Sequence, residues 1–112
     1  MLDDERLDVY HCAIHFVAAT LKLLAQMPKG HAQLADPLRR AAFSIPLNIA
    51  EGAGKTTTPD RCRFPASAPG SAMECGAILD IVALLDIIPA PDSSMAKTLI
   101  VRIVSMLSKM SR

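Results

Sequence analysis

Aromatic residues are scarce in this 112-residue sequence, which contains one tyrosine, three phenylalanines and no tryptophan, although 51% of its residues are apolar. The apolar fraction is supplied mainly by alanine, leucine, isoleucine, valine and methionine, a set that suits helix packing better than a sheet sandwich. No segment alternates apolar and polar residues with the period of a half-buried strand. The length suffices for one hydrophobic core. We therefore expect residues 1–112 to form a single all-α domain.

A strong charge of one sign is also absent, because twelve Lys and Arg residues are offset by eleven Asp and Glu residues, giving a formal net charge of +1. This balance predicts only weak attraction of nucleic acid by the molecule as a whole. The three cysteines are widely spaced and form no C-x-x-C pair. Such spacing is typical of reduced cysteines in a cytoplasmic protein.

Signals for secretion and membrane insertion are missing as well. The first residues are acidic and lack the apolar core of a signal peptide. The longest apolar stretch, Ala77–Ile88, is interrupted by Asp80 and Asp86 and is too short to span a bilayer. We expect a cytoplasmic protein that has no membrane partner.

Apolar residues recur at steps of three and four in several segments, which is the period of a helix face. The pattern predicts helices over residues 4–26, 32–53, 71–88 and 94–109. The first segment follows a strict heptad repeat, which predicts that its core positions are Leu7, Tyr10, Ile14, Val17, Leu21 and Leu24. Short connections after the first and third helices favour antiparallel neighbours. The sequence therefore predicts an up-down-up-down four-helix bundle.

Two prolines complicate the third helix. Pro65 and Pro69 precede the strongly apolar part of this segment. Each proline removes a helical hydrogen bond and clashes with the preceding turn. We expect the third helix to be kinked or shortened near these residues.

A polar stripe follows the second predicted helix. It combines residue types suited to specific hydrogen bonds and contains Arg40, Ser44, Asn48 and Glu51. We interpret the stripe as a half-buried network in which Arg40 pairs with Glu51 or with Glu74 of the third helix, because buried charges need partners. The alternative is a ligand site, such as a phosphate site, with Arg39 and Arg40 as bidentate donors.

The third predicted helix has more apolar residues than one bundle face requires. From Ser71 to Ile88, thirteen of eighteen residues are apolar, whereas a single core face needs about three in seven. A monomer would leave the excess as an exposed apolar patch. We therefore predict a subunit interface on the seam formed by Ala77, Ile81, Leu84 and Ile88.

Catalytic and metal-binding signatures are weak. His11 and His15 are four residues apart on one helix face, but two histidines without a nearby acid on that face do not complete a metal site. The E-x-x-H motif of ferritin-like bundles is absent, as is a phosphate-binding loop of the Walker type. We expect no catalytic residues, metal or cofactor. A metal-dependent enzyme built on the two histidines is the least favoured class.

The chain resembles the four-helix-bundle family encoded in intervening sequences of 23S ribosomal RNA genes. The resemblance rests on the motif R-A-x-x-S-I-x-x-N-I-A-E-G at residues 40–52, on G-S-A-M-E at residues 70–74 and on L-D-V-Y at residues 7–10. It implies a four-helix bundle that assembles into a homo-oligomeric, pentameric ring. A related branch, the accessory variability determinant of diversity-generating retroelements, binds nucleic acid and a reverse transcriptase.

A loose cluster of basic residues is consistent with the nucleic-acid-binding branch of the family that this chain resembles. A ring would repeat the cluster in every copy and so multiply its contacts with phosphates. The cluster contains Arg39, Lys55, Arg61 and Arg63. We expect a non-enzymatic scaffold or adaptor whose partner is RNA, DNA or a nucleic-acid-handling protein. The alternative is a purely protein-binding module without nucleic-acid contact.

Overall fold

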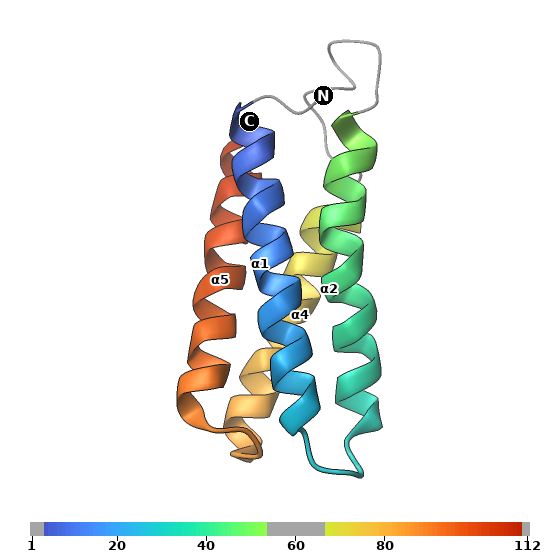
Figure 1. The fold of residues 1–112 in the computed structure, drawn as a ribbon, viewed down its shortest axis with the longest axis vertical. Helices are drawn as coiled ribbons and strands as arrows, with labels where there is room; N and C mark the ends of the chain where they lie inside the picture. The colour runs from blue at the N-terminus through green and yellow to red at the C-terminus, as the bar shows by residue number, and fades with distance from the viewer. Residues whose placement is uncertain (1–3, 54–66, 111–112) are drawn as a thin grey trace.

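The structure, a computed structural model, describes residues 4–53 and 67–110, and in these ranges the chain forms four α-helices and no strand. The helices are α1 (Asp4–Gln26), α2 (Ala32–Ala53), α4 (Ser67–Leu85) and α5 (Ala90–Met110). Figure 1 shows that consecutive helices run in opposite directions along the long axis. The predicted all-α, up-down-up-down four-helix bundle is confirmed.

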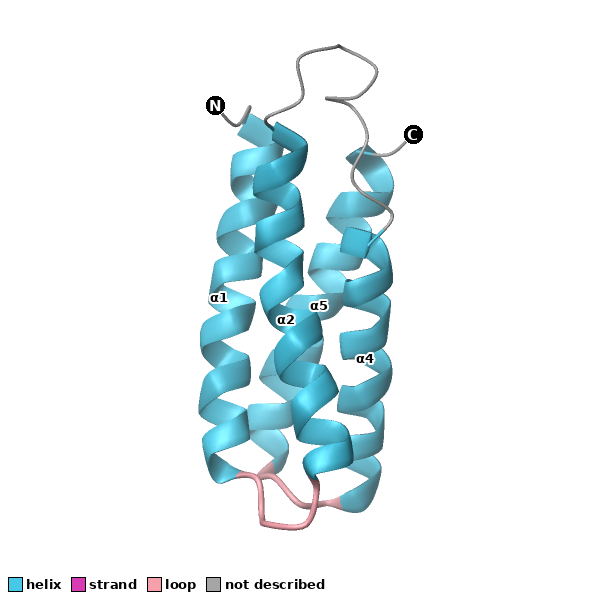
Figure 2. Ribbon diagram, turned by 90° about the vertical axis from the view of Figure 1, so that its right-hand side faces the viewer, coloured by secondary structure: helices cyan, strands magenta, loops and turns pink. Residues whose placement is uncertain are grey.

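Each helix packs against two neighbours. α1 and α4 both contact α2 and α5, so α1 and α4 occupy opposite corners of the bundle (Figure 2). Among the described residues, the core between the helices is aliphatic, and Phe16 is the one fully buried aromatic side chain. The largest fully buried apolar side chains of the core are Val9, Phe16, Leu23, Leu38, Ile45, Ile49, Leu79, Val82, Ile100, Ile103 and Leu107. Burying one such side chain stabilises the fold by about 1.5–3 kcal/mol before the entropy cost.

The first two helices have the bounds that the sequence predicts. α1 is followed by Pro28 and by Gly30, whose φ of +97° reverses the chain. α2 then begins where the carbonyl of His31 accepts the N–H groups of Leu34 and Ala35 at 3.0 Å. Pro37 and Pro46 both lie inside α2, which continues through them.

The α4 helix differs from its predicted range at both ends. It begins at Ser67 instead of Ser71, and Pro69 falls in its first turn, where the backbone N–H has no helical acceptor to lose. Pro65 lies outside the described residues. α4 ends at Leu85 because Asp86 adopts a φ of +54° and its N–H donates to the carbonyl of Ala83. The predicted continuation to Ile88 is therefore wrong.

The α5 helix begins four residues before the predicted start. The carbonyl of Pro89 accepts the N–H groups of Asp92 and Ser93, which opens the helix at Ala90. Pro91 is tolerated because it lies in the first turn.

The heptad seam predicted for α1 is not its core face. Leu7, Ile14 and Leu21 are 39–45% exposed. The buried positions lie mainly one residue earlier in the repeat, and they are Arg6, Val9, Cys12, Ala13, Phe16, Thr20 and Leu23. α1 thus has a second apolar line on its solvent side.

Two segments, Asp4–Gln26 and Ala68–Leu85, are long and apolar enough by composition to cross a membrane, with mean hydropathies of 1.3 and 1.4. A core helix of a helical bundle meets the same criterion.

Substitutions at Gly30 and Gly76 test the described backbone, because an added side chain should destabilise the protein at the first position and stabilise it at the second. Gly30→Ala should lower the free energy of unfolding by about 1 kcal/mol, because φ of +97° disfavours a side chain. Gly76→Ala should raise it by about 0.5–1 kcal/mol, since Gly76 lies inside α4 and its new Cβ would meet Lys97 Nζ at 3.8 Å, an ordinary contact. Urea unfolding of both variants measures the difference, and shifts of the same sign would contradict the described backbone.

Candidate functional site

The polar stripe of α2 meets α4 at a pair of serines. The Ser44 hydroxyl lies 2.5 Å from Ser71 Oγ and 3.0 Å from the carbonyl of Ala41. Asn48 Nδ2 donates to the carbonyl of Ser44 at 2.7 Å. These half-buried groups satisfy one another and tie the two helices together. Ser44 and Asn48 of the predicted network therefore have a structural role. Ser71 is a further partner that the sequence pattern did not predict.

The charged residues of the stripe are placed differently. Arg40, Glu51 and Glu74 are exposed. Among the described residues, no ion pair joins Arg40 to either glutamate. The predicted pairing of Arg40 is not found, because an exposed charge is solvated by water and needs no protein partner. These three side chains are available to a ligand or to another protein.

The predicted basic cluster is only partly described. Arg39 forms an exposed ion pair with Asp36, at 3.6 Å, one turn earlier in α2. Lys55, Arg61 and Arg63 lie outside the described residues. The gathering of these four residues into one patch stays a prediction.

Large apolar side chains are exposed along α4. Met73 is 62% exposed, Ile81 44% and Leu84 83%. Together with the exposed Ala77, they form a surface that we call the α4 face. Ile88 does not belong to it, since the turn after α4 returns this side chain to the core, where it is 4% exposed. The sequence prediction of an exposed seam thus describes Ala77, Ile81 and Leu84, is wrong for Ile88 and omits Met73.

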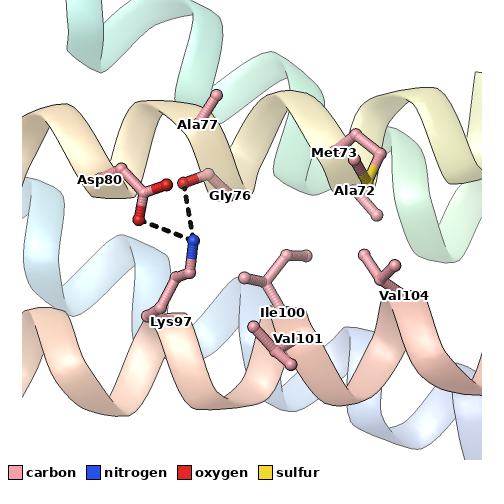
Figure 3. Close-up of a pocket in the computed structure, with 9 residues that line it drawn as sticks. All are labelled: Ala72, Met73, Gly76, Ala77, Asp80, Lys97, Ile100, Val101 and Val104. Carbon is pink, nitrogen blue, oxygen red and sulfur yellow. Dashed lines mark hydrogen bonds and ion pairs between the residues drawn. The ribbon is translucent and has the colours of Figure 1, made fainter.

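A groove lies beside the α4 face, between α4 and α5 (Figure 3). It has a volume of about 330 Å³ and is mostly apolar, with Ala72, Met73 and Val104 at one end. At the other end Lys97 Nζ donates to Asp80 Oδ1 at 2.7 Å and lies 3.4 Å from the carbonyl of Gly76. The ion pair bridges the two helices and gives an otherwise apolar groove one polar end.

Neither of the described cysteines is placed for chemistry. Cys12 and Cys75 are unpaired and buried. Burial raises the pKa of the Cys75 thiol to about 12, and the neighbouring Glu74 carboxylate adds to the shift. A thiol with this pKa remains protonated at neutral pH, so it is a poor nucleophile.

The two histidines considered as metal ligands lie on the solvent side of α1. His11 and His15 are both exposed. Within residues 4–53 and 67–110, no group of three or more His, Cys, Asp or Glu residues is placed to hold a metal ion. The apolar α4 face with its groove is therefore the candidate site on the described surface.

Comparison with known proteins identifies the family. A search of curated proteins found no significant match. The family model of the 23S rRNA-intervening sequence protein matches residues 5–109, a range that includes nearly all of the four described helices. The chain therefore belongs to the 23S rRNA-intervening sequence protein family.

Proposed function

We propose that this protein is a non-enzymatic scaffold that associates with copies of itself through the α4 face. The observation that carries the proposal is the exposure of Met73, Ile81 and Leu84 on one helix. Covering an apolar surface gains about 25 cal/mol per Å² removed from water, which favours association. A contiguous exposed apolar patch of this kind is typical of an interaction site.

The partner that we propose for the assembled scaffold is RNA, DNA or a nucleic-acid-handling protein. The sequence between α2 and α4 contains Lys55, Arg61 and Arg63 against a single acid, Asp60. One copy offers few phosphate contacts, but an assembly repeats the segment and binds with the combined strength of its copies. This repetition compensates for a net charge of only +1 per chain.

The assembly is tested by the mass of the purified protein. Size-exclusion chromatography with light scattering at micromolar concentrations should give a multiple of the 12.0 kDa chain mass. The resemblance to ring-forming relatives favours a pentamer. A mass of one chain at every concentration would refute the scaffold.

The nucleic-acid partner is tested separately by fluorescence anisotropy with labelled structured RNA and duplex DNA. Binding should be saturable and should weaken steeply between about 50 and 200 mM salt, because it releases counterions from phosphates. A variant with Lys55, Arg61 and Arg63 changed to alanine should bind less. If the assembled protein does not bind at the lower salt, the alternative of a purely protein-binding module replaces this part of the proposal.

A further inference from the structure

The groove between α4 and α5 has the size and lining of a small-molecule site. Its volume of about 330 Å³ lies within the range of about 300–1,000 Å³ that is typical of ligand pockets. Its walls are apolar except for one ion pair, which joins Lys97 of α5 to Asp80 of α4. Ligand pockets likewise combine apolar walls with a few polar groups that orient the ligand. Because both walls belong to one chain, the groove exists without the self-association proposed above.

Small residues on α4 leave the space that forms the groove. Ala72 and Gly76 lie on the α4 wall, and Ile100 and Val104 lie across from them on α5 (Figure 3). A Cβ atom at position 76 would lie 3.8 Å from Lys97 Nζ and 4.0 Å from a methyl carbon of Ile100. A long side chain at this position would therefore extend into the groove and fill it.

The apolar part of the groove is elongated along the two helices. On α5 it extends from Lys97 to Val104 (Figure 3), and seven residues of α-helix rise about 10 Å. An unbranched aliphatic chain of medium length therefore fits the groove lengthwise. Each methylene group that the groove removes from water favours binding.

The ammonium group of Lys97 determines the chemistry of the ligand's polar end. A lysine ammonium has three N–H donors and no acceptor. Within the described residues, Lys97 Nζ donates to Asp80 Oδ1 at 2.7 Å and to the carbonyl of Gly76 at 3.4 Å, so one donor is left. Figure 3 shows this nitrogen between the Asp80 carboxylate and the apolar part of the groove. A ligand in the apolar part therefore meets a cationic donor before it meets the carboxylate, and its polar end has to be an acceptor.

Charge favours a carboxylate as this acceptor. A hydrogen bond from an ammonium to a carboxylate is about twice as strong as one between neutral groups. Asp80, which competes for Lys97, has a side chain that is 67% exposed, whereas that of Lys97 is 38% exposed. Water therefore screens the charge of Asp80 more strongly than that of the ammonium. We infer that the groove binds an unbranched aliphatic carboxylate of medium length, with its carboxylate at Lys97 Nζ and its chain between α4 and α5.

The test is an NMR titration of the full-length, methyl-labelled protein with octanoate at millimolar concentrations. The methyl signals of Met73, Ile100 and Val104 should shift in a saturable way. The signals of Leu23 should not, because this residue is buried in α1, which does not pack against α4. Octylamine has the same chain with a cationic donor at its end, so it should bind at least about tenfold more weakly than octanoate.

Variants test the two parts of the groove separately. Lys97→Met keeps a long side chain but removes the donor, so it should weaken octanoate binding about tenfold. It should strengthen octylamine binding, because Asp80 then lacks its cationic partner. Gly76→Leu should fill the groove and abolish the binding of both ligands. Lys109→Met is the matched control, since Lys109 lies on α5 outside this groove, and it should bind octanoate like the wild type. Circular dichroism melts show whether each variant is folded, and Lys97→Met tests the polar end even if Gly76→Leu does not fold.

The outcomes separate this inference from the scaffold proposal, because light scattering of the same samples reports self-association. A monomer whose groove signals saturate with octanoate would refute the scaffold and support the ligand site. An oligomer whose groove signals do not shift would overturn the ligand site alone. Equal binding of octanoate and octylamine by the wild type, or shifts that persist in folded Gly76→Leu, would also overturn it.

Discussion

Leu38→Ala should lower the free energy of unfolding by about 2–5 kcal/mol, a large share of the stability of a small domain. The Leu38 side chain is 0% exposed in α2 and belongs to the core shared by the helices. Removing it forfeits its burial and leaves a cavity that the surrounding close-packed side chains fill only in part. Urea unfolding followed by circular dichroism at a fixed protein concentration measures the loss.

Leu47→Ala is the matched control, because it makes the same change in the same helix. Leu47 is 68% exposed, and surface substitutions usually change stability by no more than about 0.5 kcal/mol. The concentration is kept fixed because the proposed self-association would add to the apparent stability. Equal losses at the two positions would contradict the described orientation of α2.

Raising the pH from 9 to 10 should lower the free energy of unfolding by about 1 kcal/mol through Cys75 alone. In the folded protein burial, and secondarily Glu74, raises the pKa of this thiol from 9.0 to about 12. The unfolded chain therefore loses its thiol proton first and binds fewer protons than the folded chain in this window. The stabilisation is complete below pH 9 and is lost progressively as the pH approaches 12.

Comparison with Cys75→Ala isolates the contribution of this thiol from the other effects of alkaline pH on the protein. The variant should be less stable than the wild type near pH 7, because it loses buried atoms. The difference between the two proteins should then shrink as the pH rises above 9. A difference that stays constant from pH 7 to 10.5 would show that Cys75 is not held in a desolvated site.

The sequence predicted helix bounds correctly where local chemistry decides them. α1 and α2 have their predicted ranges, since Pro28 and Gly30 interrupt the helical pattern between them. α4 and α5 do not, because proline is compatible with a first helical turn and both helices begin with one there. The end of α4 depends on a positive φ at Asp86, which an aspartate does not signal by itself.

The phase of a helix is harder to predict than its existence. α1 is apolar on two sides. Periodicity alone is therefore compatible with two sets of core positions, one shifted by one residue from the other. The structure buries the face with Ala13 and Thr20, whose small side chains fit between neighbouring helices. The more regular heptad is exposed at Leu7, Ile14 and Leu21 and half-buried at Tyr10, Val17 and Leu24. Which face of α1 is buried depends on its packing against α2 and α5. The sequence of α1 alone does not contain this information.

Contacts at the surface were also only partly predictable from the sequence. The excess of apolar residues in the third helix predicted a subunit interface on Ala77, Ile81, Leu84 and Ile88, and this interface stays a prediction. The first three residues are exposed in the single chain, whereas Ile88 is buried. Local spacing did not identify the contact between Ser44 and Ser71, because a bond between helices depends on their relative register. Local spacing also did not indicate that Arg40 is exposed to solvent.

The most direct test of the account compares the oxidation of two methionines by hydrogen peroxide. In the single chain Met73, on the α4 face, and Met95, on α5 and outside the α4 face, are each 62% exposed. Mass spectrometry gives the rate of sulfoxide formation at each site. If the α4 face is covered by another copy, Met73 should oxidise several-fold more slowly than Met95 in the wild type. The two rates should converge in the variant Leu84→Asp, because it places a charge in the α4 face and so disfavours its burial. Equal rates in the concentrated wild-type protein would contradict the claim that the α4 face is an assembly surface.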